Sequence, residues 1–446
     1  MTVHESRLRR DAVAIYHAAL AAANPVDAVN RSVRVDGDLL RVGDRVYDLS
    51  GYDRCYVVGI GKAAAAMGYA LEQLLGDRIT GGIVIVKYGH TMNLKHLTLR
   101  EAGHPIPDEA GMRRAREMVH LLRGLGPKDL VLVVLSGGGS ALLSLPRAGI
   151  TLKEKQQVTQ QLLACGASIG ELNAIRKHLS QLKGGQLAQV IYPATSISLI
   201  LSDVVGDRLD VIASGPTVPD SSTFADCMAI VERYALELPE PVLRLFERGL
   251  RGEEEDTPKA NDPVFEKTFS LLIGSNILAL RAAAQKAREL GYNNLILSSA
   301  IEGETREIAK MHTALAKEIR ATGNPIPHPA CLISGGETTV SLRGTGLGGR
   351  NQEFVLASAL GIAGLSDTVI LSCGTDGTDG PTDAAGALAD GHTVHRAAKL
   401  GMHPAEYLSR NDSYHFFEPL GDLVKTGPTN TNVMDVRLVL VGGERP

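Results

Sequence analysis

One pattern recurs along this chain: an apolar strand that runs directly into a glycine-rich turn. It occurs at residues 55–68, 130–146, 331–353 and 368–380, and reads LVLVVLSGGGSALLSLP in the second of these segments. Helix-forming residues follow most of the turns. Such turns leave backbone N–H groups free at the start of a helix, and anions bind there. The pattern therefore predicts a protein that handles phosphate or carboxylate groups.

The alternation of strands and helices predicts an α/β fold. Most of the apolar runs are short and bounded by Gly or Pro, as expected for strands buried on both faces of a mainly parallel sheet. The predicted strands are residues 55–59, 83–87, 130–136, 197–202, 269–274, 295–299, 331–334, 338–343, 368–373 and 437–442. Helices are predicted at 62–75, 109–125, 153–166, 277–290 and 305–321.

A chain of 446 residues is too long for one ordinary hydrophobic core. The segment 247–263 is charged, lacks large apolar side chains and carries two prolines, so we interpret it as a linker or exposed loop. The sequence thus predicts two α/β/α domains with mainly parallel sheets. The first covers residues 1–250 and is Rossmann-like, and the second covers 264–446.

Composition argues against several classes of partner. Lys and Arg total 46 and Asp and Glu total 50, a net charge of −4, which disfavours nucleic acid and anionic membranes. No apolar run approaches the roughly 20 residues that span a bilayer, and Asp11 and His17 interrupt the N-terminal apolar stretch, which suits an amphipathic helix better than a signal peptide. The five cysteines show no C-x-x-C spacing, as expected in a reducing, cytoplasmic setting.

The first turn, Gly59 to Ala64, formally fits the dinucleotide-binding pattern G-x-G-x-x-[GA]. The next strand should then end in an acidic residue for the ribose hydroxyls, but it ends in Lys87 and Tyr88, which disfavours nicotinamide binding. Lys62 stands where the helix begins, and a cation there could hold a phosphoryl group during transfer. A plain surface lysine is the alternative interpretation.

The second turn contains Ser136, Gly137, Gly138, Gly139 and Ser140. Three consecutive glycines allow a close backbone approach to an anion, and both serines can donate hydrogen bonds. The turn matches neither the Walker A loop, G-x-x-x-x-G-K-[ST], nor the nucleophile elbow, G-x-S-x-G. Anion binding is favoured over a tight turn that needs glycine for its backbone alone.

Two further segments of the first half carry charged candidates. Asp203 directly follows a predicted strand, at the edge of an α/β sheet where ligands bind. It could act as a general base, hold Mg²⁺ or cap a helix. Arg176, in the basic stretch 171–188, could contribute a cation to a cleft, and a solvated helix face explains its spacing equally well.

The second half offers Glu337 after a glycine pair and Arg350 after a flexible glycine loop. Arginine recognises carboxylate and phosphate with two parallel hydrogen bonds. Asp376 lies in the run GTDGTDGPTDAAG, which lacks the order of an EF-hand calcium loop. A role with Mg²⁺ and a nucleotide is one interpretation of this run, and an Asp-Gly turn formed for backbone reasons is the other.

Taken together, these segments resemble the type II glycerate kinases, the glycerate 2-kinase family whose C-terminal region is called MOFRL. The resemblance extends over nearly the whole chain, and the motifs are specific as an ordered set. They are GIGKAAAAM (59–67), EAGHPIPDEAG (101–111), LSGGGSALL (135–143), LNAIRKHLSQLKGG (172–185), LSDVVGD (201–207), SGPTVPD (214–220), SGGETTV (334–340), GGRNQE (348–353), GTDGTDGPTDAAG (374–386) and TGPTNTNVMD (426–435).

The resemblance implies ATP-dependent phosphorylation of D-glycerate to 2-phosphoglycerate, with Mg²⁺. It also implies two α/β domains with the active site in the cleft between them. The catalytic lysine of the family corresponds to Lys62, the aspartate of LSDVVGD to Asp203 and the arginine of GGRNQE to Arg350. In this interpretation Asp203 orients or deprotonates the C2 hydroxyl, while Lys62 and Arg350 stabilise charge on the transferred phosphoryl group.

The remaining site residues are expectations of the same kind. We expect the SGGGS turn (136–140) and Arg176 to bind the substrate or its phosphate, and Asp203 and Asp376 to hold the metal. The nucleotide is expected at Gly335, Gly336, Glu337, Asn351 and Asp376. The expected partners are D-glycerate and ATP, with neither nucleic acid nor a membrane, and the expected protein is a cytoplasmic monomer or homodimer.

Two other functions fit parts of the pattern. Relatives of this family have also been labelled hydroxypyruvate reductases, so an NAD(P)H-dependent reductase is the competing enzyme. A non-catalytic phosphometabolite-binding protein would carry the same anion-binding loops and would bind without turnover.

Overall fold

The computed structural model describes residues 3–443 and divides into two compact units. Unit 2 consists of residues 25–273. Unit 1 combines residues 1–24 with 274–446. The predicted domains 1–250 and 264–446 differ from these two units in two respects. The N-terminal helix packs with the second half of the chain, and the other unit extends to residue 273.

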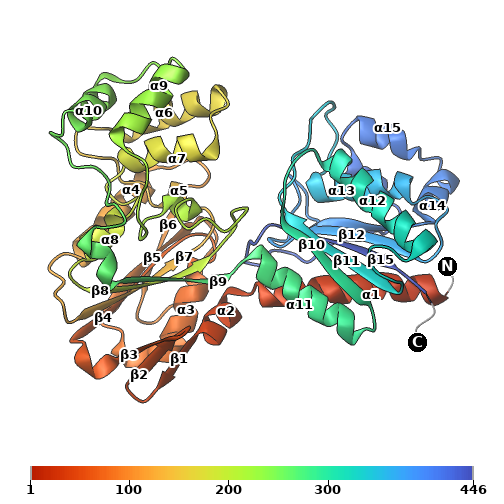
Figure 1. Ribbon diagram of the computed structural model, residues 1–446, viewed down its shortest axis with the longest axis horizontal. Helices are drawn as coiled ribbons and strands as arrows, with labels where there is room; N and C mark the ends of the chain where they lie inside the picture. The colour runs from red at the N-terminus through yellow and green to blue at the C-terminus, as the bar shows by residue number, and fades with distance from the viewer. Residues whose placement is uncertain (1–2, 444–446) are drawn as a thin grey trace. The chain divides into compact units, whose positions relative to one another are not determined.

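The sheet of unit 2 has six strands in the order β6-β5-β4-β7-β8-β9 (Figure 1). Strands β4 to β8 pair in parallel. Numbered along the chain, the order is 3-2-1-4-5-6, that of a Rossmann-like sheet, and the topological switch point lies between β4 and β7. The strands are β4 (Arg54–Ile60), β5 (Gly81–Lys87), β6 (Thr98–Ala102), β7 (Asp129–Leu135), β8 (Thr195–Leu201) and β9 (Thr268–Gly274).

Helices cover both faces of this sheet. Side chains of successive strand residues point to opposite faces: Val58 of β4 packs in one cluster with Met118 of α4, whereas Val84 of β5 lies against Gly68 of α3. The helices of the unit are α2 (Pro25–Ser32), α3 (Ala64–Leu75), α4 (Glu109–Leu121), α5 (Gly139–Leu142), α6 (Leu152–Ala164), α7 (Ile169–His178), α8 (Gln186–Ile191), α9 (Phe224–Arg233) and α10 (Glu240–Leu250). A small antiparallel sheet joins β1 (Val33–Asp36), β2 (Leu39–Val42) and β3 (Arg45–Asp48).

Helices α6, α7, α9 and α10 share a second hydrophobic core, centred on residues such as Leu162, Ile175, Phe224 and Phe246. Three of these helices begin with a capping box, in which the N-cap hydroxyl and an acidic residue three positions later satisfy each other's backbone N–H groups. Sequence reasoning predicted only one helix of this region, at 153–166, and did not predict α9 and α10.

The predicted linker 247–263 lies inside unit 2. His178 on α7 contacts Asp256 at 2.8 Å, and Arg147 contacts Glu254 at 3.1 Å. Lys259 adds an ion pair with Asp256 at 3.1 Å. The charges that indicated a solvated linker are therefore used to fix this segment to the helical region.

The sheet of unit 1 has the order β10-β11-β15-β12-β13-β14. Only β10 and β11 pair in parallel, and the remaining neighbours are antiparallel. The expectation of a mainly parallel sheet is therefore wrong for this unit, because the last strand of the chain inserts between β11 and β12 in the opposite direction. The strands are β10 (Asn293–Ile301), β11 (Ala330–Gly336), β12 (Thr368–Gly374), β13 (Gly386–Asp390), β14 (Leu423–Val424) and β15 (Asp435–Val441).

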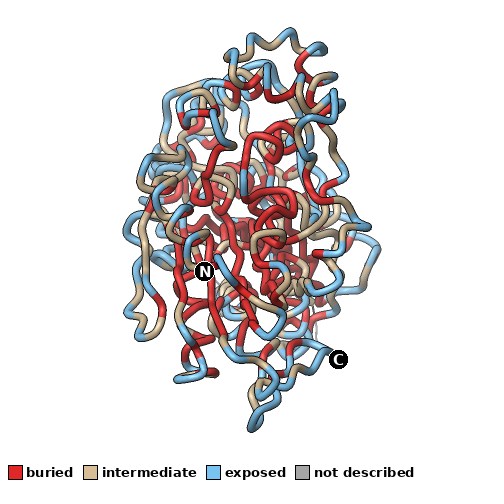
Figure 2. The backbone as a smooth tube through the Cα atoms, turned by 90° about the vertical axis from the view of Figure 1, so that its left-hand side faces the viewer, coloured by how far each residue is buried: buried red, intermediate tan, exposed pale blue. Residues whose placement is uncertain are grey.

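Figure 1 shows α1 and α11 on one face of this sheet and α12 and α13 on the other. Strands β11, β12 and β15 are buried along their whole length, and in Figure 2 buried residues (red) fill the interior while exposed residues (pale blue) lie toward the outside. The helices are α1 (Val3–Ala22), α11 (Asn276–Glu289), α12 (Thr305–Thr322), α13 (Arg350–Gly361), α14 (Thr393–Lys399), α15 (Pro404–Ser409) and α16 (Ser413–Phe417).

The predicted strand 338–343 does not form. Beyond Gly336 the chain makes only an isolated bridge, between Thr339 and Glu304, and Leu342 is 81% exposed. Because β15 occupies the position beside β11, the sheet offers no partner to this β-prone segment.

Helix α1 is tied to unit 1 by buried polar contacts as well as by apolar packing. The Tyr16 hydroxyl donates to the carbonyl of Gly374 at 2.8 Å, and the Tyr292 hydroxyl donates to Asp11 at 2.7 Å. No single described helix is long and apolar enough to cross a membrane; the bent pair Arg7–Ala22 and Pro25–Ser32 passes that test on length and composition alone.

Replacing Ile15 by Ala should lower the free energy of unfolding of unit 1 by about 2–5 kcal/mol, because the Ile15 side chain is fully buried. Hydrogen exchange followed by mass spectrometry should show faster exchange in β12 and β15. Arg10→Ala, on the exposed side of the same helix, is the matched control and should change nothing. Faster exchange in β4 and β7 instead would contradict the assignment of α1 to unit 1.

Candidate active site

Two turns of unit 2 interlock at the carboxyl edge of the sheet, where β4 and β7 end. Gly61 has φ +131°, and a Cβ atom there would lie 2.2 Å from Ser136 Oγ. The backbone N–H of Lys62 donates to the carbonyl of Gly137 at 2.9 Å, and that of Ala63 donates to Ser136 Oγ at 3.0 Å. Lys62 is thereby held in the turn before α3, at the switch point where α/β folds bind ligands. Helix α3 begins two residues later than its predicted start.

Each glycine of the SGGGS turn faces a neighbouring group. A Cβ atom on Gly137 would lie 2.1 Å from Asp203 Oδ2, and one on Gly138 would lie 2.9 Å from His104 Cδ2. A Cβ atom on Gly139 would meet that of Ala213 at 2.6 Å. Close packing therefore requires these glycines, and their number alone is not a signal of anion binding. The same packing brings Asp203 and His104 to the turn.

Asp203 is half-buried, two residues beyond the end of β8. The segment that follows contains three successive residues with positive φ, namely Ala213 at 51°, Ser214 at 60° and Gly215 at 60°. Such conformations are costly for residues with a side chain, and they cluster at functional sites. Here the bend brings Ser214 Oγ within 2.9 Å of Ser140 Oγ, and Ser214 donates to Asn173 Oδ1 at 3.0 Å. Ser140 is thereby held in position.

Basic groups dominate this edge of the sheet. Burial, together with Lys62, Lys87 and His90, lowers the pKa of His104 to about 4. Burial also lowers the pKa of His90, and Lys87 and Lys62 add to the effect, although a hydrogen bond to the Lys62 carbonyl acts in the opposite direction. Burial is the main reason that both histidines are kept neutral, and the additional effect of the lysines indicates a local positive potential that suits an anionic ligand.

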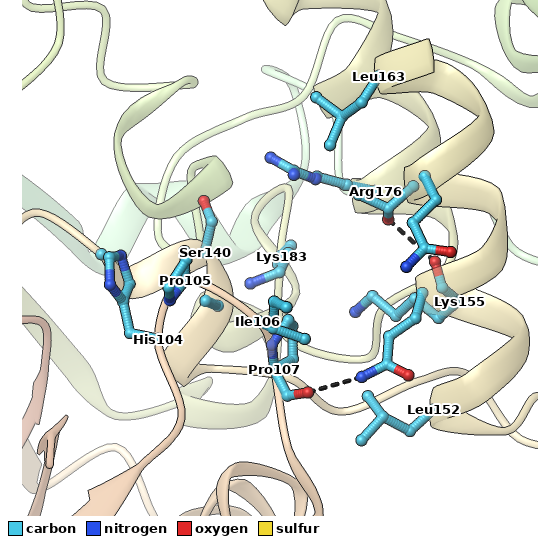
Figure 3. A pocket seen from close by; sticks show the side chains of 15 residues that line it. His104, Pro105, Ile106, Pro107, Ser140, Leu152, Lys155, Leu163, Arg176 and Lys183 are labelled. Atoms are coloured by element: carbon cyan, nitrogen blue, oxygen red, sulfur yellow. Dashed lines mark hydrogen bonds between the residues drawn. The ribbon is translucent and has the colours of Figure 1, made fainter. Parts of the chain in front are cut away.

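A cavity of about 460 Å³ opens beside the SGGGS turn. Gly138, Ser140 and Arg176 line it, so the structure brings these three predicted substrate-binding residues together. Figure 3 shows Arg176 from α7 and Ser140 from α5 facing the same space. His104, which sequence reasoning did not select, also lines the cavity, although it belongs to the motif EAGHPIPDEAG.

In unit 1, Arg350 is the first residue of α13 and is engaged by two carboxylates. Its Nε and Nη2 donate to Asp435 at 2.8 and 3.0 Å, and its Nη1 donates to Glu337 at 2.6 Å. Asp435 is fully buried, whereas the Glu337 side chain is 46% exposed. The buried ion pair with Asp435 therefore fixes the orientation of the Arg350 guanidinium, whereas a ligand could replace the exposed Glu337 carboxylate.

Asp379 occupies the N-terminus of α13. Its carboxylate accepts from the backbone N–H groups of Asn351 at 3.0 Å and Gln352 at 2.8 Å. Burial raises the pKa of Asp379 to about 6, against the lowering effect of these two amides. Asn351 also donates through Nδ2 to Asp435 at 2.9 Å. The glycine-rich loop before α13 predicted an anion site at the start of that helix. The carboxylate of Asp379, which sequence reasoning did not select as a site residue, occupies this position.

Gly335 and Gly336 lie inside β11. A Cβ atom on Gly335 would lie 1.8 Å from Asn276 Oδ1, and Gly336 has φ +111° with Ile301 directly against it. Asp376 is half-buried, and its Oδ1 accepts from the N–H of Thr378 at 3.1 Å, an Asx-type turn contact. Packing and turn formation thus account for three of the residues assigned to the nucleotide.

Among the side chains that the structure describes, no group of three or more His, Cys, Asp or Glu residues is placed to hold a metal ion. The two predicted metal ligands belong to different units, Asp203 to unit 2 and Asp376 to unit 1.

Known proteins resemble this chain over nearly its full length. Residues 11–247 match the family described as a domain of unknown function, DUF4147, and residues 330–435 match the MOFRL family. The D-glycerate 2-kinase of Thermotoga maritima is 43% identical over 390 residues, which cover 87% of this chain and 91% of that protein. A protein of Agrobacterium vitis with a provisional hydroxypyruvate reductase name is 42% identical over 446 residues, covering 99% and 96%.

The fold agrees with these matches. The crystal structure of a glycerate kinase from Thermotoga maritima superimposes with a TM-score of 0.89 at 40% sequence identity, and the match covers 98% of this chain and 100% of that one. Sequence and fold agree over both units, and the chain belongs to the glycerate 2-kinase family.

Proposed function

We propose that this protein is an ATP-dependent kinase that phosphorylates D-glycerate and releases 2-phosphoglycerate and ADP. The observation that carries the proposal is the cluster of Lys62, the SGGGS turn and Asp203 at the switch point of a parallel sheet. Family membership supplies the substrate, since relatives matched over most of their length are named glycerate kinases.

The cluster suits phosphoryl transfer, in which catalysis is mainly positioning and electrostatic stabilisation. The Asp203 carboxylate orients the C2 hydroxyl and accepts its proton. The Lys62 ammonium, with its backbone fixed between two turns, stabilises the negative charge that develops on the phosphoryl oxygens.

We assign the nucleotide to the segment around Arg350 in unit 1, with Gly335, Gly336, Glu337, Asn351 and Asp376 as the proposed binding residues. Arg350 keeps its paired hydrogen bonds to buried Asp435, which orient the guanidinium. Its third contact, to the exposed Glu337, is the one that a phosphate oxygen replaces.

Magnesium fits this chemistry as part of the nucleotide complex. In such complexes Mg²⁺ is held by phosphate oxygens, waters and only one or two carboxylates, so a cluster of three acidic residues is not required. Asp203 of unit 2 and Asp376 of unit 1 are the carboxylates that we propose as candidate ligands, each within its own unit. When bound, the ion neutralises charge on the phosphates.

A reducing compartment such as the cytoplasm suits the five cysteines, all of which are free thiols and four of which are buried. We propose that the protein acts there on D-glycerate and ATP, as a monomer or homodimer, without nucleic acid or a membrane as a partner.

The reductase name of the Agrobacterium relative makes a hydroxypyruvate reductase the second candidate. A dinucleotide site needs free amides in the first turn for the pyrophosphate and an acid after the next strand. Here the amides of Lys62 and Ala63 are already bonded to the second turn, and β5 ends in Lys87. Both observations favour the kinase, and a non-catalytic binding protein is distinguished by the absence of turnover.

Purified protein supplied with D-glycerate and MgATP should release ADP and 2-phosphoglycerate, identified by phosphorus NMR. Lys62→Ala should lower kcat about 10²- to 10³-fold, as for the loss of one charge-stabilising donor. Lys128→Ala is the matched control, because Lys128 is exposed just before β7, at the opposite end of that strand. NADPH or NADH consumption with hydroxypyruvate, and no ADP release with glycerate, would overturn the proposal.

Asp203→Asn should lower kcat about 10²- to 10⁴-fold, because the amide cannot accept the proton of the hydroxyl. Its KM for D-glycerate should change much less, since the amide keeps the size of the carboxylate. Asp53→Asn, on an exposed residue just before β4, is the control. A variant with unchanged kcat would remove Asp203 from the proton-transfer step.

A further inference from the structure

The cavity beside the SGGGS turn carries an unbalanced charge. Its basic side chains are Lys155 from α6, Arg176 from α7, Lys183 from the turn after α7, and His104. None of its lining residues is Asp or Glu. Burying cations without counter-charges is unfavourable, so such an arrangement calls for a ligand or a structural reason.

Lys155 is the clearest case. It is 5% exposed, and its Nζ has no hydrogen-bond partner within the part of the chain that the structure describes. Lys183 is completely buried, and its Nζ donates to the carbonyl of Leu143 at 2.7 Å. An ammonium group can donate three hydrogen bonds, so most of the donor capacity of these two groups is not used by the contacts of the fold.

Lys177, another buried lysine of the same region, has a structural role because a carboxylate of the fold compensates its charge. Lys177, next to Arg176 on α7, is 3% exposed, and its Nζ pairs with Asp220 at 3.0 Å. Asp220 in turn accepts from Ser222 and Thr257. In this structural cluster the charge is compensated within the fold. In the cavity, the structure gives Lys155 no such carboxylate.

Figure 3 shows Lys155 and Lys183 directed toward the same space, with Arg176 above them. Apolar side chains, including Ile106, Leu152 and Leu163, form much of the remaining wall. Such walls lower the local dielectric and strengthen a hydrogen bond between a cation and an anionic oxygen.

We propose that this cavity is the carboxylate subsite for a small 2-hydroxy acid, in which Lys155, together with Arg176 and Lys183, binds the acid group. This assignment rests on the proposed function and adds the residues that recognise the carboxylate of the substrate. Ser140 and Gly138 line the same cavity, and Gly138 also lies next to Lys62, so a three-carbon acid held by its carboxylate extends from the cations toward the reacting edge. Lys155 and Lys183 are thus specificity-determining residues that reject uncharged polyols.

The binding test measures D-glycerate affinity by calorimetry without nucleotide, in wild type and in Lys155→Met. The variant should bind glycerate about 10- to 100-fold more weakly, the effect of losing a hydrogen bond to a charged group. Glycerol, which has a hydroxyl group in place of the carboxylate, should not bind wild type measurably. Lys153→Met, on an exposed position of the same helix, is the matched control and should bind as wild type does.

Thermal melting separates binding from structure. Methionine removes a buried charge without a partner, so Lys155→Met without ligand should melt at or above the wild-type temperature, whereas a structural lysine would lower it. If Lys155→Met does not fold, Arg176→Met, at a position that is only partly buried, carries the same binding test.

The outcomes distinguish the inference from the proposed function. Wild type that binds glycerate through Lys155 but releases no ADP supports the subsite and overturns the kinase assignment. Turnover with an unchanged KM for glycerate in Lys155→Met overturns the subsite and leaves the kinase in place. Inorganic phosphate binding that depends on Lys155, with glycerate binding that does not, also overturns the carboxylate assignment.

The same lysine predicts a pH dependence of stability for the unliganded protein. Burial, and to a smaller extent Arg176, lowers the pKa of Lys155 from 10.5 to about 7. Between these values the unfolded state binds more protons, so the free energy of unfolding should rise as the pH increases across this interval. The charged or titratable groups around it are Arg176, Lys183 and His104, and burial lowers the pKa of each of them.

In urea unfolding across this pH interval, the free energy of unfolding should therefore rise less in Lys155→Met than in wild type. Some rise should remain, because Lys183 is a second buried lysine with a lowered pKa. Saturating D-glycerate should also reduce the rise in wild type, since a bound carboxylate favours the charged lysine. An equal rise in wild type and Lys155→Met would contradict the burial of a charge-bearing amine at this position.

Discussion

The contact between two turns at the carboxyl edge of one sheet governs the geometry of the site. Gly61 and Ser136 lie so close that no side chain fits between them, and the amides of Lys62 and Ala63 are bonded to the second turn. A lysine side chain is long and flexible, but here the backbone that carries it has little freedom. Strands β4 and β7 pair in parallel over their whole length, and their register therefore fixes the position of the Lys62 backbone.

The candidate sites of the two units differ in how their buried charges are compensated. In unit 1 the buried carboxylates are compensated: Asp435 by Arg350 and Arg437, and Asp379 by the amides that begin α13. In unit 2 the cavity contains cations without carboxylate partners. The first arrangement is complete within the fold and fixes side chains. The second leaves cationic donors without carboxylate partners among the described residues, and on this we base the proposal of an anionic acceptor for unit 2.

Sequence reasoning identified most strands and the turns that carry Lys62, Ser140, Asp203 and Arg350, because each lies where an apolar run gives way to small residues. It could not give the direction of β15, since a strand buried on both faces looks the same in either orientation. It missed Lys155, because nothing in the pattern KEKQQ distinguishes a lysine facing a cavity from one facing water. It also over-interpreted the glycines, several of which are needed for packing alone.

Helix α1 is encoded before unit 2, but its partners α11, β12 and β15 are encoded only after unit 2. At about 5–20 residues per second, the roughly 250 residues in between take on the order of 10–50 s to synthesise. Throughout that interval the elements that bury Leu8, Ile15 and Tyr16 in the folded unit have not yet been made. Unit 2, by contrast, is continuous in sequence and can fold as it emerges. The order of synthesis thus separates α1 from the strands and helix that bury its apolar face by the whole of unit 2.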